Sequence, residues 1–127
     1  MGHVGLLPQT ATNYKTKGKN FTQKKQIFED AIAVSNSGAF AIVIECVVEN
    51  LAKKITKNVS IPTIGIGASM HCDGQILVTD DMIGLSDFLP KFVKQYSNLK
   101  KVIEKSIKNY SEDVKLRRFP SSKNVYN

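Results

Sequence analysis

Glu45 is the first charged residue of an otherwise apolar run, AIVIECVVE at positions 41–49. A buried carboxylate without a partner costs several kcal/mol, so a charge in this place needs a physical reason. Burial disfavours the charged form, which makes such a carboxylate an effective proton acceptor or donor near neutral pH. Two interpretations are open: Glu45 is an acid–base group, or it forms an ion pair with a lysine.

Other positions also carry residues that suit a ligand site. His3 stands among glycines in the segment GHVGL, and its imidazole either faces a ligand or is buried in a hydrogen bond. The turn GIGAS at 65–69 lacks the full spacing of a dinucleotide loop and the lysine of a phosphate loop. We expect Gly65 and Gly67 to let a substrate approach the backbone. Asp80 and Asp81 suit either a hard cation or a cap on the following turn, and we favour the cap.

Four segments have strand character, and they alternate with helical patterns. They are 2–6, 39–45, 61–66 and 76–79. Most lack period-2 alternation, which is typical of strands covered on both faces in parallel sheets. Apolar spacing predicts helices over 22–37 and 48–58, so the order indicates a parallel β/α architecture with right-handed crossovers. Because parallel strands end at one edge, we expect His3, Glu45 and the glycine turn to share that edge.

The chain changes character after residue 80. We expect a loop with a short helix around 91–96, an amphipathic helix over 99–118 and a tail over 119–127. The apolar stripe of the amphipathic helix consists of Val102, Ile103, Ile107, Tyr110 and Val114. Residues 1–98 are then the β/α region that carries the chemistry.

Composition places the chain among ordinary globular proteins. It has 127 residues, of which 42% are hydrophobic and 23% charged, enough for one modest core. No apolar run is long enough to span a membrane and no signal peptide is evident, so we expect a cytoplasmic protein without membrane contact. Cys46 and Cys72 lack the spacing of a zinc site or a disulfide framework and are expected to be reduced packing residues. The net charge of +7 is interpreted as a solvated lysine surface, with nucleic-acid binding as a weaker alternative.

Six sequence blocks follow one another in order along the chain. They are GHVGLLPQ at 2–9, GAFAIVIECV at 38–47, LAKKIT at 51–56, IPTIGIGAS at 61–69, CDGQILVTDDMIGL at 72–85 and PKFVKQY at 90–96. Together they resemble the ketopantoate hydroxymethyltransferase family. The resemblance implies the fold class α/β, as about strands 5–8, the C-terminal half, of a phosphoenolpyruvate-mutase-like (β/α)8 barrel. Residues 1–98 would be the partial barrel, and we expect the reading frame to be truncated or to start internally.

The resemblance also implies a reaction and roles for individual residues. The family transfers a hydroxymethyl group from 5,10-methylenetetrahydrofolate to 3-methyl-2-oxobutanoate, giving 2-dehydropantoate in pantothenate biosynthesis. Its proton acceptor is the glutamate of the ECV motif, which corresponds to Glu45, and its site-lining histidine corresponds to His3. The family uses Mg²⁺, whose ligands would lie in the missing N-terminal half, so no metal ligand is assigned in this chain. It also forms homo-oligomers.

Two departures and one alternative stand beside this resemblance. The family usually has proline where this chain has Val48, which should alter the start of the next helix without moving the carboxylate. Ser69 is a mild change in the glycine turn. The alternative is a catalytically inactive half-barrel that self-associates through its open strand edges, because half a barrel exposes two of them.

Overall fold

The structure is a computed structural model that describes residues 1–9 and 15–126. It divides into two compact units, Met1–Leu77 and Val78–Asn127. Each unit is described by itself. The boundaries at residues 98 and 118, which the sequence predicts between the β/α region, the amphipathic helix and the tail, stay a prediction.

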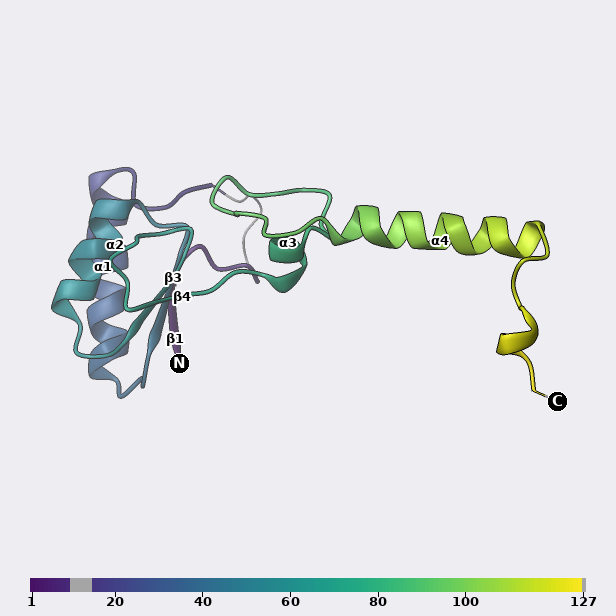
Figure 1. The fold of residues 1–127 in the computed structure, drawn as a ribbon. Helices are drawn as coiled ribbons and strands as arrows, with labels where there is room; N and C mark the ends of the chain where they lie inside the picture. The colour runs from purple at the N-terminus through teal and green to yellow at the C-terminus, as the bar shows by residue number, and fades with distance from the viewer. Residues whose placement is uncertain (10–14, 127) are drawn as a thin grey trace. The chain divides into compact units, whose positions relative to one another are not determined.

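A four-stranded parallel sheet forms the centre of the first unit (Figure 1). The strands follow chain order across the sheet and are β1 (Gly2–Gly5), β2 (Ile42–Glu45), β3 (Thr63–Ile66) and β4 (Gly74–Gln75). All three neighbouring pairs are parallel, which confirms the predicted α/β character of the chain. Within the described residues β1 and β4 are the two edge strands.

Helices α1 (Phe21–Asn36) and α2 (Glu49–Asn58) cover one face of this sheet (Figure 1). The core between sheet and helices is apolar and tightly buried. Its members are Val4, Ile27, Ala31, Ile42, Ile44, Val47, Leu51, Ala52, Ile55 and Cys72. Because strand side chains alternate between faces, the burial of Val4, Ile42 and Ile44 against the helices turns His3, Val43 and Glu45 to the other face.

The bounds of α1 follow from its capping residues. The Asn20 side chain accepts a hydrogen bond from the Gln23 N–H at 2.8 Å, which satisfies one free donor of the first turn. At the other end Gly38 has φ +83°, a left-handed conformation that stops the helix without a side-chain clash. The helix expected over 22–37 is confirmed to within one residue.

The last strand differs from its prediction. A strand was expected over 76–79, but β4 is Gly74–Gln75, and Thr79 already begins helix α3 (Thr79–Ile83). The prediction was wrong because the run ILVT lies largely at the surface, with Ile76 and Val78 exposed. Asp80 and Asp81 occupy the first turn of α3, where negative charge is favourable at a helix N-terminus. They do not cap it, because the N-cap position is Val78.

The expected helix around 91–96 is also absent from the described residues. The backbone of this segment makes one turn, from the Val93 N–H to the Pro90 carbonyl, and then bonds elsewhere. The Tyr96 N–H donates to the Met82 carbonyl and the Ser97 hydroxyl to the Ile83 carbonyl. These bonds satisfy the open carbonyls at the end of α3, and this competing use of the segment explains the wrong prediction.

Helix α4 (Leu99–Lys115) begins where it was expected and ends three residues early. Its N-cap Asn98 accepts a hydrogen bond from the Lys101 N–H. Arg117 has φ +55°, and the Arg118 N–H folds back to the Asp113 carbonyl at 2.8 Å, which ends the helix. No residue of α4 is buried, so its apolar stripe is exposed in this chain. In the tail, Ser122–Asn124 form a short 3₁₀ helix.

Asp73 ties the loop before β4 to the first residue of β3. One carboxylate oxygen accepts both the Thr63 N–H and the Thr63 hydroxyl, each at 2.8 Å. These hydrogen bonds hold the pKa of the Asp73 carboxyl below its usual value, with the backbone donor as the larger cause. The contact therefore favours the folded state whenever Asp73 is ionised.

We predict that in Asp73→Asn the free energy of unfolding depends less on pH in the acid range. A lowered pKa in the folded state adds stability that is present above the unfolded pKa, near 4, and is lost as pH falls through the lower folded value. Because Asp73 is exposed, we expect a loss of at most about 1 kcal/mol in the free energy of unfolding at neutral pH. Urea unfolding from about pH 7 down to about pH 3 measures both effects. An unchanged acid dependence in the variant would contradict the assignment.

Candidate active site

The candidate site lies at the carboxyl edge of the first three strands. Glu45 is the last residue of β2, paired in register with Gly5 on β1 and Ile66 on β3. Its neighbours in the sheet are therefore the ends of both adjacent strands. In parallel β/α proteins this edge is where loops converge and ligands bind.

His3 and Glu45 approach each other on the face that α1 and α2 do not cover. His3 Nε2 is 3.2 Å from Glu45 Oε2, and their side chains are 30% and 13% exposed. The direction of approach is not that of a hydrogen bond, and Nε2 is buried with no hydrogen-bond partner in the described part of the chain. The lysine partner considered on sequence grounds is not found: within the described residues no lysine lies within ion-pair distance of Glu45, and the side chain beside the carboxylate is the His3 imidazole.

Two glycines bring β1 close enough for this contact. A Cβ on Gly2 would lie 2.1 Å from Val34 Cγ1 of α1, and a Cβ on Gly5 would lie 2.2 Å from the Glu45 carbonyl oxygen. Gly5 also has φ +98°, which side chains rarely adopt. The Leu6 N–H donates to the same Glu45 carbonyl at 2.9 Å. The GHVGL segment therefore holds His3 beside Glu45 by close backbone packing.

Cys46 sets the backbone that follows the carboxylate. Its φ is +51°, an uncommon conformation for a residue other than glycine, and its N–H donates to the Ile66 carbonyl at 2.9 Å. Such strained positions concentrate at functional sites. Burial, and then the charge of Glu45, raise the pKa of the Cys46 thiol, so it remains protonated at neutral pH and is a poor nucleophile. Sequence reasoning recognised Cys46 as a buried packing residue but gave no signal of this turn.

The two predicted glycines lie in different places. Gly67 follows the end of β3 with φ +60°, so it turns the chain at the same edge as Glu45. Gly65 pairs with Ile44 and thus points to the helix-covered face. A Cβ there would lie 2.9 Å from Gln75 Oε1 and 3.1 Å from Cys72 Sγ. A substrate at Glu45 would meet only the main chain of Gly65, whose side-chain space is filled by Gln75.

Gln75 is a residue that sequence reasoning missed. Its side-chain N–H donates to the Ser69 carbonyl at 2.8 Å and so holds the turn after β3. The Ser69 hydroxyl in turn accepts the His71 N–H at 3.1 Å. The run GQILVT gave no indication of this contact, because it depends on β4 lying beside β3.

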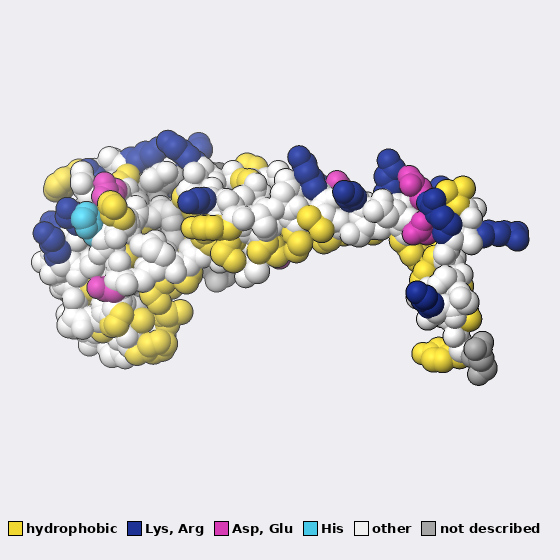
Figure 2. Space-filling model, in the orientation of Figure 1, with side chains coloured by type: hydrophobic (Ala, Val, Ile, Leu, Met, Phe, Trp, Pro, Cys, Tyr) yellow, Lys and Arg dark blue, Asp and Glu magenta, His cyan; other side chains and the backbone are white. Residues whose placement is uncertain are grey.

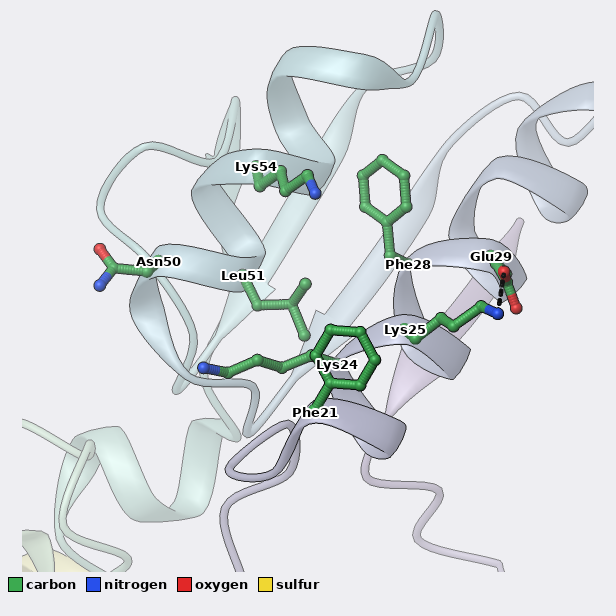
Figure 3. Close-up of a pocket in the computed structure, with 8 residues that line it drawn as sticks. All are labelled: Phe21, Lys24, Lys25, Phe28, Glu29, Asn50, Leu51 and Lys54. Carbon is green, nitrogen blue, oxygen red and sulfur yellow. Dashed lines mark ion pairs between the residues drawn. The ribbon is translucent and has the colours of Figure 1, made fainter.

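A separate surface groove of about 410 Å³ lies between α1 and α2. Figure 3 shows the side chains that line it, which include Phe21, Phe28 and Leu51 together with three lysines. Lys25 pairs with Glu29 at 3.8 Å, and Lys54 lies 4.6 Å from the centre of the Phe28 ring. Neither His3 nor Glu45 lines this groove. It therefore does not contain the candidate acid–base pair.

The sheet is parallel, a partly buried glutamate lies at its carboxyl edge, and a histidine of the adjacent strand lies beside that glutamate. This arrangement is that of an α/β enzyme segment. The family model described as ketopantoate hydroxymethyltransferase matches residues 1–122. The chain belongs to this family.

Curated relatives agree with the family match. A 3-methyl-2-oxobutanoate hydroxymethyltransferase of Pelagibacter ubique is 52% identical over 126 residues, which covers 99% of this chain and 49% of the relative. Proteins of the same name from Phenylobacterium zucineum and Bartonella henselae are 52% and 53% identical over 129 residues, with 47% of each relative covered. The chain thus spans about half the length of the curated relatives it matches.

We predict that Gly5→Ala separates β1 from β2. The added Cβ would meet the Glu45 carbonyl at 2.2 Å and Val47 Cγ2 at 2.5 Å, and backbone cannot give way cheaply. We expect a loss of about 3 kcal/mol or more in the free energy of unfolding. Gly38→Ala is the matched control, because Gly38 also has positive φ but nothing lies within 4 Å of its Cβ position. Its loss should be about 1 kcal/mol. Equal losses in urea unfolding would show that the close approach of the strands is unimportant.

Proposed function

We propose that this chain carries the acid–base part of a 3-methyl-2-oxobutanoate hydroxymethyltransferase. The reaction transfers a hydroxymethyl group from 5,10-methylenetetrahydrofolate to 3-methyl-2-oxobutanoate and gives 2-dehydropantoate, a step of pantothenate biosynthesis. The observation that carries the proposal is the Glu45 carboxylate, 13% exposed at the end of β2 and 3.2 Å from a buried imidazole nitrogen. The names of the curated relatives support 3-methyl-2-oxobutanoate as the acceptor and a hydroxymethyl group as the group transferred.

Glu45 acts as the proton acceptor in this proposal. The C3–H bond of the oxo acid breaks, the proton passes to a carboxylate oxygen of Glu45, and the electron pair enters an enolate. The one-carbon unit then bonds to C3 and to the oxygen of a water molecule, while its two C–N bonds to the folate break. One proton from that water and the proton held by Glu45 go to the two folate nitrogens, and tetrahydrofolate leaves. His3 and Gly67 line the pocket around the reacting carbon, and Gly65 contributes main chain only.

We assign no metal ligand to this chain. Among the described residues no group of three His, Cys, Asp or Glu side chains is placed to hold a metal ion. We therefore propose that the ligands of the expected Mg²⁺ come from the part of the longer protein outside this chain. We also propose that residues 1–98 form the C-terminal half, about strands 5–8, of a (β/α)8 barrel. The parallel order of β1 to β4 supports this placement.

We also propose a cytoplasmic location for the enzyme. In the described part of the chain, no helix combines the length and apolarity needed to cross a bilayer.

We predict that a fusion of the N-terminal half of the Pelagibacter ubique relative to residues 2–127 forms 2-dehydropantoate. The assay contains 3-methyl-2-oxobutanoate, 5,10-methylenetetrahydrofolate and Mg²⁺, and product is measured by mass spectrometry. Glu45→Gln keeps the shape but removes the proton acceptor, so kcat should fall by at least about 100-fold. Glu49→Gln is the matched control, because Glu49 is exposed on α2, and it should retain activity. A fusion that is folded by circular dichroism and shows no turnover would refute the proposed activity.

Self-association is the second candidate function, and we propose that it produces a homo-oligomer. The stripe Val102, Ile103, Ile107, Tyr110 and Val114 is exposed along α4. Figure 2 shows lysine and arginine side chains along this helix, with hydrophobic side chains also at the surface. Exposed apolar stripes of this kind mark interaction surfaces. Edge strands β1 and β4 offer further unpaired backbone groups.

We predict that Ile107→Ser weakens association of the chain by at least about tenfold in Kd. Ile107 is 63% exposed and lies in the middle of the stripe, so the variant removes apolar contact area without affecting the core. Lys105→Ser serves as the control, since it lies outside the stripe on the same helix. Sedimentation equilibrium measures both constants. A wild-type chain that stays monomeric at high concentration would rule out the association.

A further inference from the structure

The His3 imidazole contains a buried nitrogen whose hydrogen-bonding capacity is unused. Nε2 is buried and makes no hydrogen bond to any described residue, although Glu45 Oε2 is 3.2 Å away. Buried polar atoms are nearly always paired, and an unpaired one costs about 1–3 kcal/mol of stability. The two atoms are within hydrogen-bond distance, and catalytic hydrogen bonds that are poorly aligned in a free enzyme commonly tighten when a ligand binds.

The surroundings would strengthen a hydrogen bond between these two side chains. His3 pairs in register with Val43, which is 6% exposed and lies on the same face as Glu45. An apolar neighbour strengthens a hydrogen bond to a charged oxygen, because less water competes for it. The backbone beneath is rigid, since Gly2 packs against α1 and Gly5 against β2. Neither side chain therefore depends on a loop for its position.

We infer that His3 is the positioning residue for Glu45. Its Nε2–H donates to Oε2 and turns the other oxygen, Oε1, toward the C3–H of the oxo acid. In the proton transfer the C3–H bond breaks and the Oε1–H bond forms, while the electron pair enters the enolate and the imidazole keeps its proton. The role rests on the proposed function of Glu45, but it concerns a different residue and a separate measurement.

The other candidates for this role are already engaged or too far away. His71, the second histidine of the chain, lies 3.9 Å from Glu49 at the start of α2. The Cys46 thiol is buried and protonated, and the residue directly follows Glu45 in a left-handed turn. Within the described residues, His3 is the one side chain in ion-pair distance of the Glu45 carboxylate.

The test uses the fusion enzyme described above with variants at position 3. His3→Ala should lower kcat by about 10- to 100-fold, the loss expected for one hydrogen bond to a charged group. KM for the oxo acid should change much less than kcat, because the imidazole acts mainly by orienting Glu45 and its contact with the substrate, as a residue that lines the pocket, is secondary. His3→Gln places an amide N–H near the position of Nε2 and should recover kcat to within about fivefold of the wild type.

A double variant separates positioning from a general structural effect. If His3 acts through Glu45, then adding His3→Ala to Glu45→Gln should cost less than about threefold in kcat. His71→Ala is the matched control and should keep wild-type kcat. Thermal unfolding verifies that each variant is folded.

Three results would overturn the inference, each with an active wild-type fusion. They are full kcat in His3→Ala, equal losses in His3→Ala and His3→Gln, and a full additional loss in the double variant. An inactive but folded wild-type fusion would instead refute the proposed function, and this role with it.

Discussion

The close approach of β1 to β2 is the constraint on which the candidate site depends. The Leu6 N–H donates to the Glu45 carbonyl at 2.9 Å, directly beside a glycine that has no room for a side chain. This packing fixes the main chain of Glu45 and brings the His3 imidazole to 3.2 Å from the carboxylate. The geometry of the candidate site thus depends on contacts between backbone groups that carry no net charge.

The hydrophobic core and the candidate site lie on opposite faces of the sheet. Val4, Ile42 and Ile44 pack against α1 and α2 on one face, and their burial is the main driving force for folding of this unit. His3 and Glu45 occupy the other face of the same strands. Because alternate residues of a strand point to opposite faces, one apolar run provides both a core and a partly buried carboxylate. A shift of register by one residue would exchange the two.

In the described part of the chain, two sheet edges and one apolar helix stripe are left uncovered. Both observations are consistent with a segment of a larger protein. The sheet has open edges at β1 and β4, and helix α4 buries none of its apolar stripe. Unpaired strand edges and exposed apolar stripes are normally covered in stable proteins. The match to about half the length of the relatives agrees with this observation. In the proposed enzyme, further chain or a further copy would cover these surfaces.

The sequence by itself determined the local elements and the family. Apolar spacing located α1, α2 and the start of α4, and the uniform apolar character of 42–44 identified a strand in which these three residues are all buried. These features depend on residues near one another in the chain, so periodicity and caps reveal them. Six ordered motifs indicated the family that the comparison then showed.

Only the tertiary structure decided which distant groups meet. Nothing in the local pattern shows that Gly65 faces Gln75, or that His3 and not a lysine lies beside Glu45. The predictions of a strand over 76–79 and of a helix around 91–96 were wrong for the same reason. The surface position of Ile76 and Val78, and the bond from Tyr96 to Met82, are set by long-range packing. Propensity is a weak guide wherever a short segment has a competing partner far away in the sequence.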